Sequence, residues 1–291
     1  MRITDAILAE RIISSINESK ARLGELQNIL ATGKKINRPS DDPLRISSVF
    51  DLKKELQEID QYLRNIETAT TWIDLTTQTL TQISDILNSA RVIALRESSA
   101  TSTSMSRAAA AQEVKNLKKQ LLNLANTSLG GKYLFSGTKT LTKPFLEDGT
   151  YRGDEGEIRI EVEDNQTVIV NVPGNKIFQG EEDIFSVLSD LEKALNINDI
   201  QAISSQIERI DASLRQIHRW EGEFGGRGKR IKIFESRLKD QMVGITKLLS
   251  ITEDADTVKV IIELQHAGAA YQAALHAGRE ILQYTLIDFW E

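Results

Sequence analysis

The sequence predicts a mainly α-helical protein, a long coiled-coil-like helical bundle with one small β insertion domain. Apolar residues recur at alternating steps of three and four through both ends and much of the middle of the 291-residue chain. That spacing places them along one side of a helix. Aromatic residues make up 5% of the chain and there are 4 prolines, a composition that suits helices better than sandwiches or barrels.

The first predicted helix fills the N-terminal segment. Its apolar series runs without a slip through Ala9, Ile12, Ile16, Ser19, Leu23, Leu26 and Leu30. Gly33 follows as a common helix stop, and residues 34–40 have the composition of a connector. Asp42 then suits the N-cap of a second helix and Pro43 its first position.

The second predicted helix is long. Its apolar series runs from Val49 to Ala94, which gives roughly 80 Å at about 1.5 Å per residue if the helix is unbroken. A polar break at 101–104 precedes a third helix, which ends before Gly130 and Gly131.

Residues 132–180 differ in pattern from the rest of the chain. Ile158, Ile160 and Val162 alternate with charged residues, and after a turn at 164–166 three valines alternate with Ile169 and Asn171. This pattern predicts a β-hairpin with one apolar face. Fewer than about 50 residues bury little core alone, so we expect this insertion to lean on the helices.

Helices resume near Glu182, and a long heptad series begins around Asp199. Its members, each seven apart, are Ile203, Ile210, Ile217, Phe224, Ile231, Leu238 and Ile245. Four glycines, at positions 222, 225, 226 and 228, lie among them, and an interior glycine costs about 1 kcal/mol relative to Ala. The preserved phase favours a continuous helix that is bent or closely packed there. A loop is the alternative.

A last helix follows residues 252–256 and runs to the end. We therefore expect terminal coiled-coil segments at 1–42 and 256–291, a bundle of long helices at 43–131 and 181–255, and a β insertion at 132–180. The terminal stripes need partners: each other, neighbouring subunits, or both. The candidate subunit-packing residues are Ile12, Ile16, Leu23, Leu26, Leu30, Ile261, Leu264, Tyr271, Leu275, Leu282 and Phe289.

The terminal segments are expected to behave differently before and after assembly. In an isolated subunit they should be mobile, because no partner offsets the entropy of ordering them. Leu26, within the N-terminal series, is expected to be largely solvated in the single subunit and buried on assembly.

Composition and charge exclude several classes of partner. The formal net charge of −6 argues against nucleic acid and against an anionic membrane surface. No apolar run reaches the length of about 18 residues that a membrane span needs. The chain has no Cys, which removes disulfides, thiolate catalysis and Cys-based zinc sites. No apolar segment typical of a secretory signal follows Met1, so we expect any export to need no cleaved signal peptide.

No group of residues predicts catalysis, a metal or a cofactor. His218, His266 and His276 lack the spacing of a zinc motif. Capping explains Asp42, with Asp41 as its solvated neighbour. Glu253, Asp254 and Asp256 lack the Gly and final Glu of an EF-hand, and are expected to begin the last helix. We therefore expect the chain not to be an enzyme.

The connector after the first helix resembles a signature of the flagellin superfamily. The residues that carry the resemblance are Gly33, Asn37, Arg38, Pro39, Asp41 and Asp42, within the stretch 30–43. The form Asn-Arg-Pro-Ser-Asp-Asp-Pro is more similar to hook–filament junction proteins, a branch of hook-associated proteins, than to flagellin itself. The stretches 151–157, 253–256 and 271–275 also resemble that branch.

The resemblance implies a structural subunit of the bacterial flagellum. Such proteins are exported unfolded and form an extracellular ring between a hook-side junction protein and the first flagellin subunits. It implies as partners other copies of the chain, that junction protein, flagellin and an export chaperone. A flagellin filament subunit is the near alternative, against which Arg38-Pro39 and the small β insertion argue. A cytosolic coiled-coil tether is a more distant one.

Overall fold

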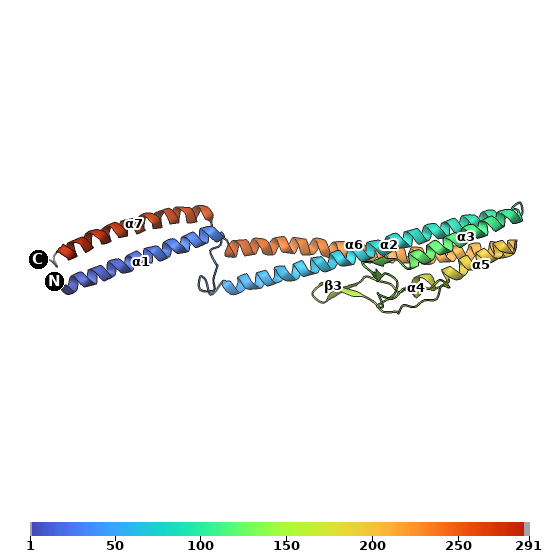
Figure 1. Ribbon diagram of the computed structural model, residues 1–291, viewed down its shortest axis with the longest axis horizontal. Coiled ribbons are helices and arrows are strands. Elements are labelled where there is room, and N and C mark those ends of the chain that lie inside the picture. The colour runs from blue at the N-terminus through green and yellow to red at the C-terminus, as the bar shows by residue number, and fades with distance from the viewer. Residues whose placement is uncertain (1, 288–291) are drawn as a thin grey trace. The chain divides into compact units, whose positions relative to one another are not determined.

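A computed structural model describes residues 2–287 of the chain, and within the terminal helices the side chains of Ile7 and of residues 10–279. The predicted fold class is confirmed, since the described part consists of seven helices and two small two-stranded sheets (Figure 1). The helices are α1 (Arg2–Thr32), α2 (Ile46–Glu97), α3 (Ser104–Ala125), α4 (Gly174–Phe178), α5 (Ile184–Asn196), α6 (Ile200–Glu253) and α7 (Thr257–Ile287). The strands are β1 (Ser128–Leu129), β2 (Lys132–Tyr133), β3 (Arg159–Glu163) and β4 (Gln166–Ile169).

The chain divides into two compact units. The first consists of Met1–Glu58 with Gln241–Glu291, and the second of Ile59–Asp240. The first contains α1 and α7, and the second contains α3, α4, α5 and all the strands. The long helices α2 and α6 contribute residues to both units.

The core of the second unit is built on the heptad series of α6. Its members from Ile203 to Leu238 are all buried, and they share this core with Leu80, Ile83 and Leu87 of α2. Helix α6 is continuous over 54 residues, so the helical alternative at Gly222–Gly228 is correct and the loop is not. The phase of the apolar series was decisive because a helix must preserve it to keep one face buried.

The predicted hairpin is formed by β3 and β4. Ile160 pairs with Val168 and Arg159 with Ile169, with an irregularity in register between Glu161 and Glu163. Asn165 makes the turn with a φ of 55°, in the left-handed region that Asn tolerates. Val162 and Val168 are buried, which confirms the apolar face.

The outer edges of this hairpin are held by side chains from α2 and α6. Asn65 Nδ2 of α2 donates to the carbonyl oxygen of Glu161 at 2.8 Å. Arg227 Nη1 of α6 donates to the carbonyl oxygens of Ile169 and Asn171 at 3.1 and 3.0 Å. Paired edge groups protect a short sheet from unwanted strand addition, so the hairpin leans on the helices as expected.

A second, shorter hairpin and an aromatic cluster were not predicted. Gly130 and Gly131, expected only to mark a helix end, form the turn between β1 and β2 with φ of 57° and 80°. The cluster brings together Phe135, Phe145, Phe178 and Phe185, with ring centroids 5.0–5.6 Å apart in the contacting pairs. These rings fill the space between α4, α5 and the segment after β2.

A buried charged network joins the turn between α2 and α3 to the turn before α6. The Arg107 guanidinium donates to the carbonyl oxygens of Glu97 and Ser99 at 3.0 and 2.9 Å, and to Asn198 Oδ1. The Glu97 carboxylate accepts from the hydroxyls of Ser102 and Ser106 and from Arg96 Nε. Glu97 and Arg107 are both buried, so each charge depends on these partners.

Candidate assembly site

Helices α1 and α7 lie side by side in the first unit (Figure 1). They pack closely at Gly278, where an added Cβ would lie 3.1 Å from both Ile12 Cγ2 and Ile16 Cδ1. Gly268 lies opposite Leu23, whose Cδ1 would be 3.9 Å from such a Cβ. Small residues on α7 thus receive the larger apolar side chains of α1. The two terminal segments, far apart in sequence, are each other's first partner.

An ion pair and two buried side chains complete this pair of helices. Arg22 Nη2 of α1 contacts Glu263 Oε2 of α7 at 3.1 Å. Leu26 is 2% exposed and Val260 9%. The expectation that Leu26 is solvated in the single subunit is therefore wrong, because packing within the first unit already covers it. A charge placed at Leu26 would disturb the subunit itself.

The predicted packing residues other than the buried Leu26 fall into three groups. Ile12, Ile16, Leu23, Leu264 and Tyr271 are half-buried, as a pair of helices without further neighbours would leave them. Leu30, Ile261 and Leu275 are exposed. The side chain of Leu282 and the whole of Phe289 lie outside the described residues.

Other exposed apolar residues were missed by the sequence reasoning. Ile7 and Ile13 of α1 and Val258 and Ile262 of α7 are each about half or more exposed. Their signal was present in the adjacent apolar pairs Ile12-Ile13 and Ile261-Ile262, which widen a stripe beyond one face of a helix. The helix pair therefore buries one apolar face and leaves several large apolar side chains exposed on both helices. These exposed side chains make the pair a candidate for packing against further subunits.

Backbone hydrogen bonds join the segment after α1 to the end of α6 and the segment between α6 and α7. Lys35 N donates to the carbonyl oxygen of Glu253 at 2.8 Å, and Ala255 N donates to that of Gly33 at 2.9 Å. Gly33 has a φ of 70°, which is why glycine suits this position. The family-signature connector is thus fastened to the end of α6.

Glu253 is buried at this junction. Its Oε1 lies 2.6 Å from Lys53 Nζ and 3.1 Å from Lys34 Nζ. The expectation that Glu253 helps begin the last helix is therefore wrong. It is the last residue of α6, and it links α2 to the connector. Asp256 does cap α7, since its Oδ1 accepts from the backbone nitrogens of Val258 and Lys259 at 3.1 Å.

Asp41 organises the connector and is more than a solvated neighbour of the cap. Its Oδ2 accepts from the backbone nitrogens of Asn37 and Arg38 at 2.8 and 2.7 Å. These two hydrogen bonds hold the pKa of Asp41 below its ordinary value. Asp42 accepts from the backbone nitrogens of Leu44 and Arg45 at 3.1 Å. It therefore caps a turn at 43–45, whereas α2 begins at Ile46, so the prediction that Pro43 takes the first position of this helix is wrong. The signature acids therefore fix the connector's shape, while Arg38 and Pro39 are exposed.

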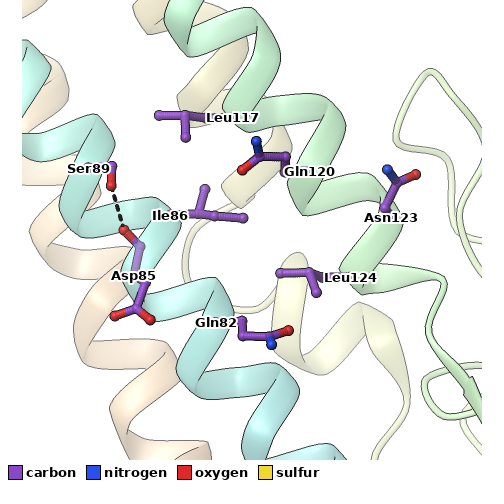
Figure 2. Close-up of a pocket in the computed structure, with 8 residues that line it drawn as sticks. All are labelled: Gln82, Asp85, Ile86, Ser89, Leu117, Gln120, Asn123 and Leu124. Atoms are coloured by element: carbon purple, nitrogen blue, oxygen red, sulfur yellow. Dashed lines mark hydrogen bonds between the residues drawn. The ribbon is translucent and has the colours of Figure 1, made fainter.

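Little in the described part of the chain resembles a chemical site. Within it no three His, Cys, Asp or Glu side chains are grouped as metal ligands. An open groove of about 460 Å³ between α2 and α3 is floored by Ile86, Leu117 and Leu124 and rimmed by amides (Figure 2). Ser89 there donates to the backbone oxygen of Asp85 at 2.9 Å, so no base activates its hydroxyl. In the described range no helix is long and apolar enough to span a membrane.

Comparisons with known proteins place the chain among flagellar proteins. Residues 3–140 match the bacterial flagellin N-terminal helical region. Over 95% of its length the chain is 26% identical to flagellar hook-associated protein 3 of Escherichia coli K12, and the match spans 96% of that protein. The N-terminal part of the chain is therefore similar to proteins of the flagellin superfamily. The signature at Gly33–Asp42 lies inside the matched region.

Among these relatives the chain is more similar to hook-associated proteins than to flagellins. A solved structure of a putative flagellar hook-associated protein from Vibrio parahaemolyticus aligns with a TM-score of 0.68 at 22% identity, covering 73% of this chain and 99% of that one. Polar flagellin F of Vibrio parahaemolyticus is 24% identical, but the match spans only 49% of its length. The chain therefore has the length and fold of a hook-associated protein.

Proposed function

We propose that this chain is the structural subunit that forms the adaptor ring between a hook-side junction protein and the flagellin filament. The match to nearly the full length of a hook-associated protein carries this proposal. The uncovered apolar residues of the α1–α7 pair support it, because they give the subunit a surface for self-assembly.

The proposed mechanism is packing, without making or breaking covalent bonds. Fully burying a large apolar side chain contributes about 1.5–3 kcal/mol. Each subunit carries several such residues on α1 and α7, among them Ile13, Val258 and Ile262. Burying them against neighbouring copies would stabilise a closed ring, while ordering the terminal helices opposes it. A ring that has the same contact between every two neighbouring copies can connect two tubes that are built from different proteins.

The partners follow from this role. They are other copies of the chain, a hook-side junction protein on one side and flagellin on the other, with an export chaperone before assembly. The location is the extracellular flagellum. Neither nucleic acid nor a membrane is part of the proposal, and no catalytic step is assigned.

The location of the chain on purified flagella separates this function from its alternatives. Antibodies against the chain, detected with gold particles by electron microscopy, should label one narrow band at the hook end of each filament. Labelling along the filament would identify a flagellin and overturn the adaptor role. Absence from purified flagella, with the chain retained in the cell, would favour a cytosolic tether.

A further inference from the structure

Four glycines lie within seven residues of α6, the 54-residue helix of the heptad series. A Cβ added at Gly222, Gly225 or Gly226 would meet nothing within 4 Å, and one at Gly228 would make an ordinary contact of 3.7 Å with Ile73. All four positions are helical. Neither close packing nor backbone conformation therefore requires glycine here, in contrast to Gly278 of α7.

The two faces of this segment differ in how firmly they are held. On the inner face Ile217, Phe224 and Ile231 are all buried. On the outer face Gly222, Gly225 and Gly226 are exposed, with no side chains to shield the backbone hydrogen bonds from water. Glycine also loses more backbone entropy than any other residue when it becomes helical. Local opening is therefore easiest on the outer side of these turns.

The same segment carries an attachment point of the β3–β4 hairpin. Arg227 lies between these glycines and donates to the carbonyl oxygens of Ile169 and Asn171. Its guanidinium also lies over the Phe224 ring, 4.7 Å from the centroid. The residues of low helix propensity therefore lie where α6 binds the hairpin, and not at an end of the helix.

We propose that residues 222–228 are a yielding segment of α6, at which the helix opens or bends locally while its buried face stays in place. The segment would let the second unit change its curvature without losing its core. This inference does not depend on the proposed junction role, because it rests on α6 alone.

Hydrogen exchange of the full-length chain, followed by mass spectrometry, tests this proposal. Amides at 222–228 should exchange at least tenfold faster than those at 203–216 and 231–240 of the same helix. Replacing one exposed helical glycine by Ala should slow local opening about fivefold. The variant Gly222→Ala with Gly225→Ala and Gly226→Ala should therefore slow exchange in the segment about a hundredfold.

Gly244→Ala is the matched control, since Gly244 is another α6 glycine whose added Cβ meets nothing within 4 Å. It should leave exchange at 222–228 unchanged. If the triple variant does not fold, Gly225→Ala alone must still show the fivefold slowing. Wild-type exchange as slow as in the flanking turns would overturn the proposal. So would an Ala variant that fails to slow the segment, or a control that slows it equally.

Discussion

Gly278 of α7 faces Ile12 of α1 so closely that a Cβ on the glycine would lie 3.1 Å from the isoleucine Cγ2. Ile16 Cδ1 is equally close. The terminal helices therefore pack closely at a position without a side chain, and a large residue at 278 would overpack this contact. The spacing of this pair decides which apolar residues remain available to other subunits.

Gly278→Leu is predicted to separate α1 from α7. Overpacking of this kind costs about 1–3 kcal/mol. In purified flagella, a bismaleimide should link Arg22→Cys to Glu263→Cys efficiently, because these side chains are in contact and the chain has no other Cys. Adding Gly278→Leu should lower the yield about tenfold. Gly268→Ala, whose Cβ meets Leu23 at an ordinary distance, is the control and should not lower it.

The described parts of the terminal helices are predicted to be mobile in the isolated chain. Their exposed residues, such as Ile13 and Ile262, gain no contacts there to offset the entropy of ordering. Hydrogen exchange at 10–30 and 257–279 should be much faster than in the heptad core of α6. Equally slow exchange in the two regions would show that the α1–α7 pair is stable without assembly.

Glu253→Gln is predicted to loosen the connector. The carboxylate is buried, but its Lys34 and Lys53 partners are about 40% exposed, so solvent screening limits the loss to about 1 kcal/mol. Trypsin cleavage after Lys34 and Lys35 should accelerate about fivefold. Glu58→Gln, which removes an exposed carboxylate near Lys54, should leave the rate unchanged. A double-mutant cycle with Lys53→Gln should show coupling.

Lowering the pH is predicted to destabilise the second unit, because the Glu97 carboxylate becomes protonated. Burial alone would raise the pKa of Glu97, but hydrogen bonds from Ser102, Arg96 and Ser106 outweigh it and hold the pKa below its ordinary value. A depressed pKa in the folded state contributes stability above the unfolded pKa of about 4.3. That stability is lost as pH falls through the lower, folded pKa. As the pH is lowered from 7 to 3, the urea midpoint should fall less steeply for Glu97→Gln than for the wild type.

The parts of the fold that could be predicted are those with a strict period. The series from Ile203 to Leu238 predicted a buried face of α6 through its glycines, and alternation around Ile160 predicted the β3–β4 hairpin. Periodicity contains no information about long-range contacts between irregular segments. The aromatic cluster around Phe145 and the burial of Glu253 depend on such contacts, so they could not be predicted.

Only part of the candidate site could be predicted, because a helical pattern does not identify the partner that covers it. A stripe on α1 shows that a partner exists but not which one, so Leu26 could be assigned to an intersubunit contact although it is already buried within its own chain. The structural role of Asp41 was missed, because an acid that accepts two backbone hydrogen bonds cannot be told from a solvated one by sequence alone.

We expect the exposed apolar residues of α1 and α7 to form the assembly surface, and Ile13→Asp places a charge within it. Ile13 is 52% exposed in the single chain, so the charge costs little before assembly but several kcal/mol once buried without a partner. Ser15→Asp, at an exposed position of the same helix, is the control.

The decisive measurement is the amount of each variant incorporated in purified flagella relative to the amount exported. Ile13→Asp should be exported and folded, with the thermal midpoint of the second unit unchanged. Its incorporation should fall at least a hundredfold, equivalent to about 2.8 kcal/mol, while flagellin appears free in the medium. Ser15→Asp should be incorporated like the wild type. Normal incorporation of Ile13→Asp would contradict the assignment of this face to assembly.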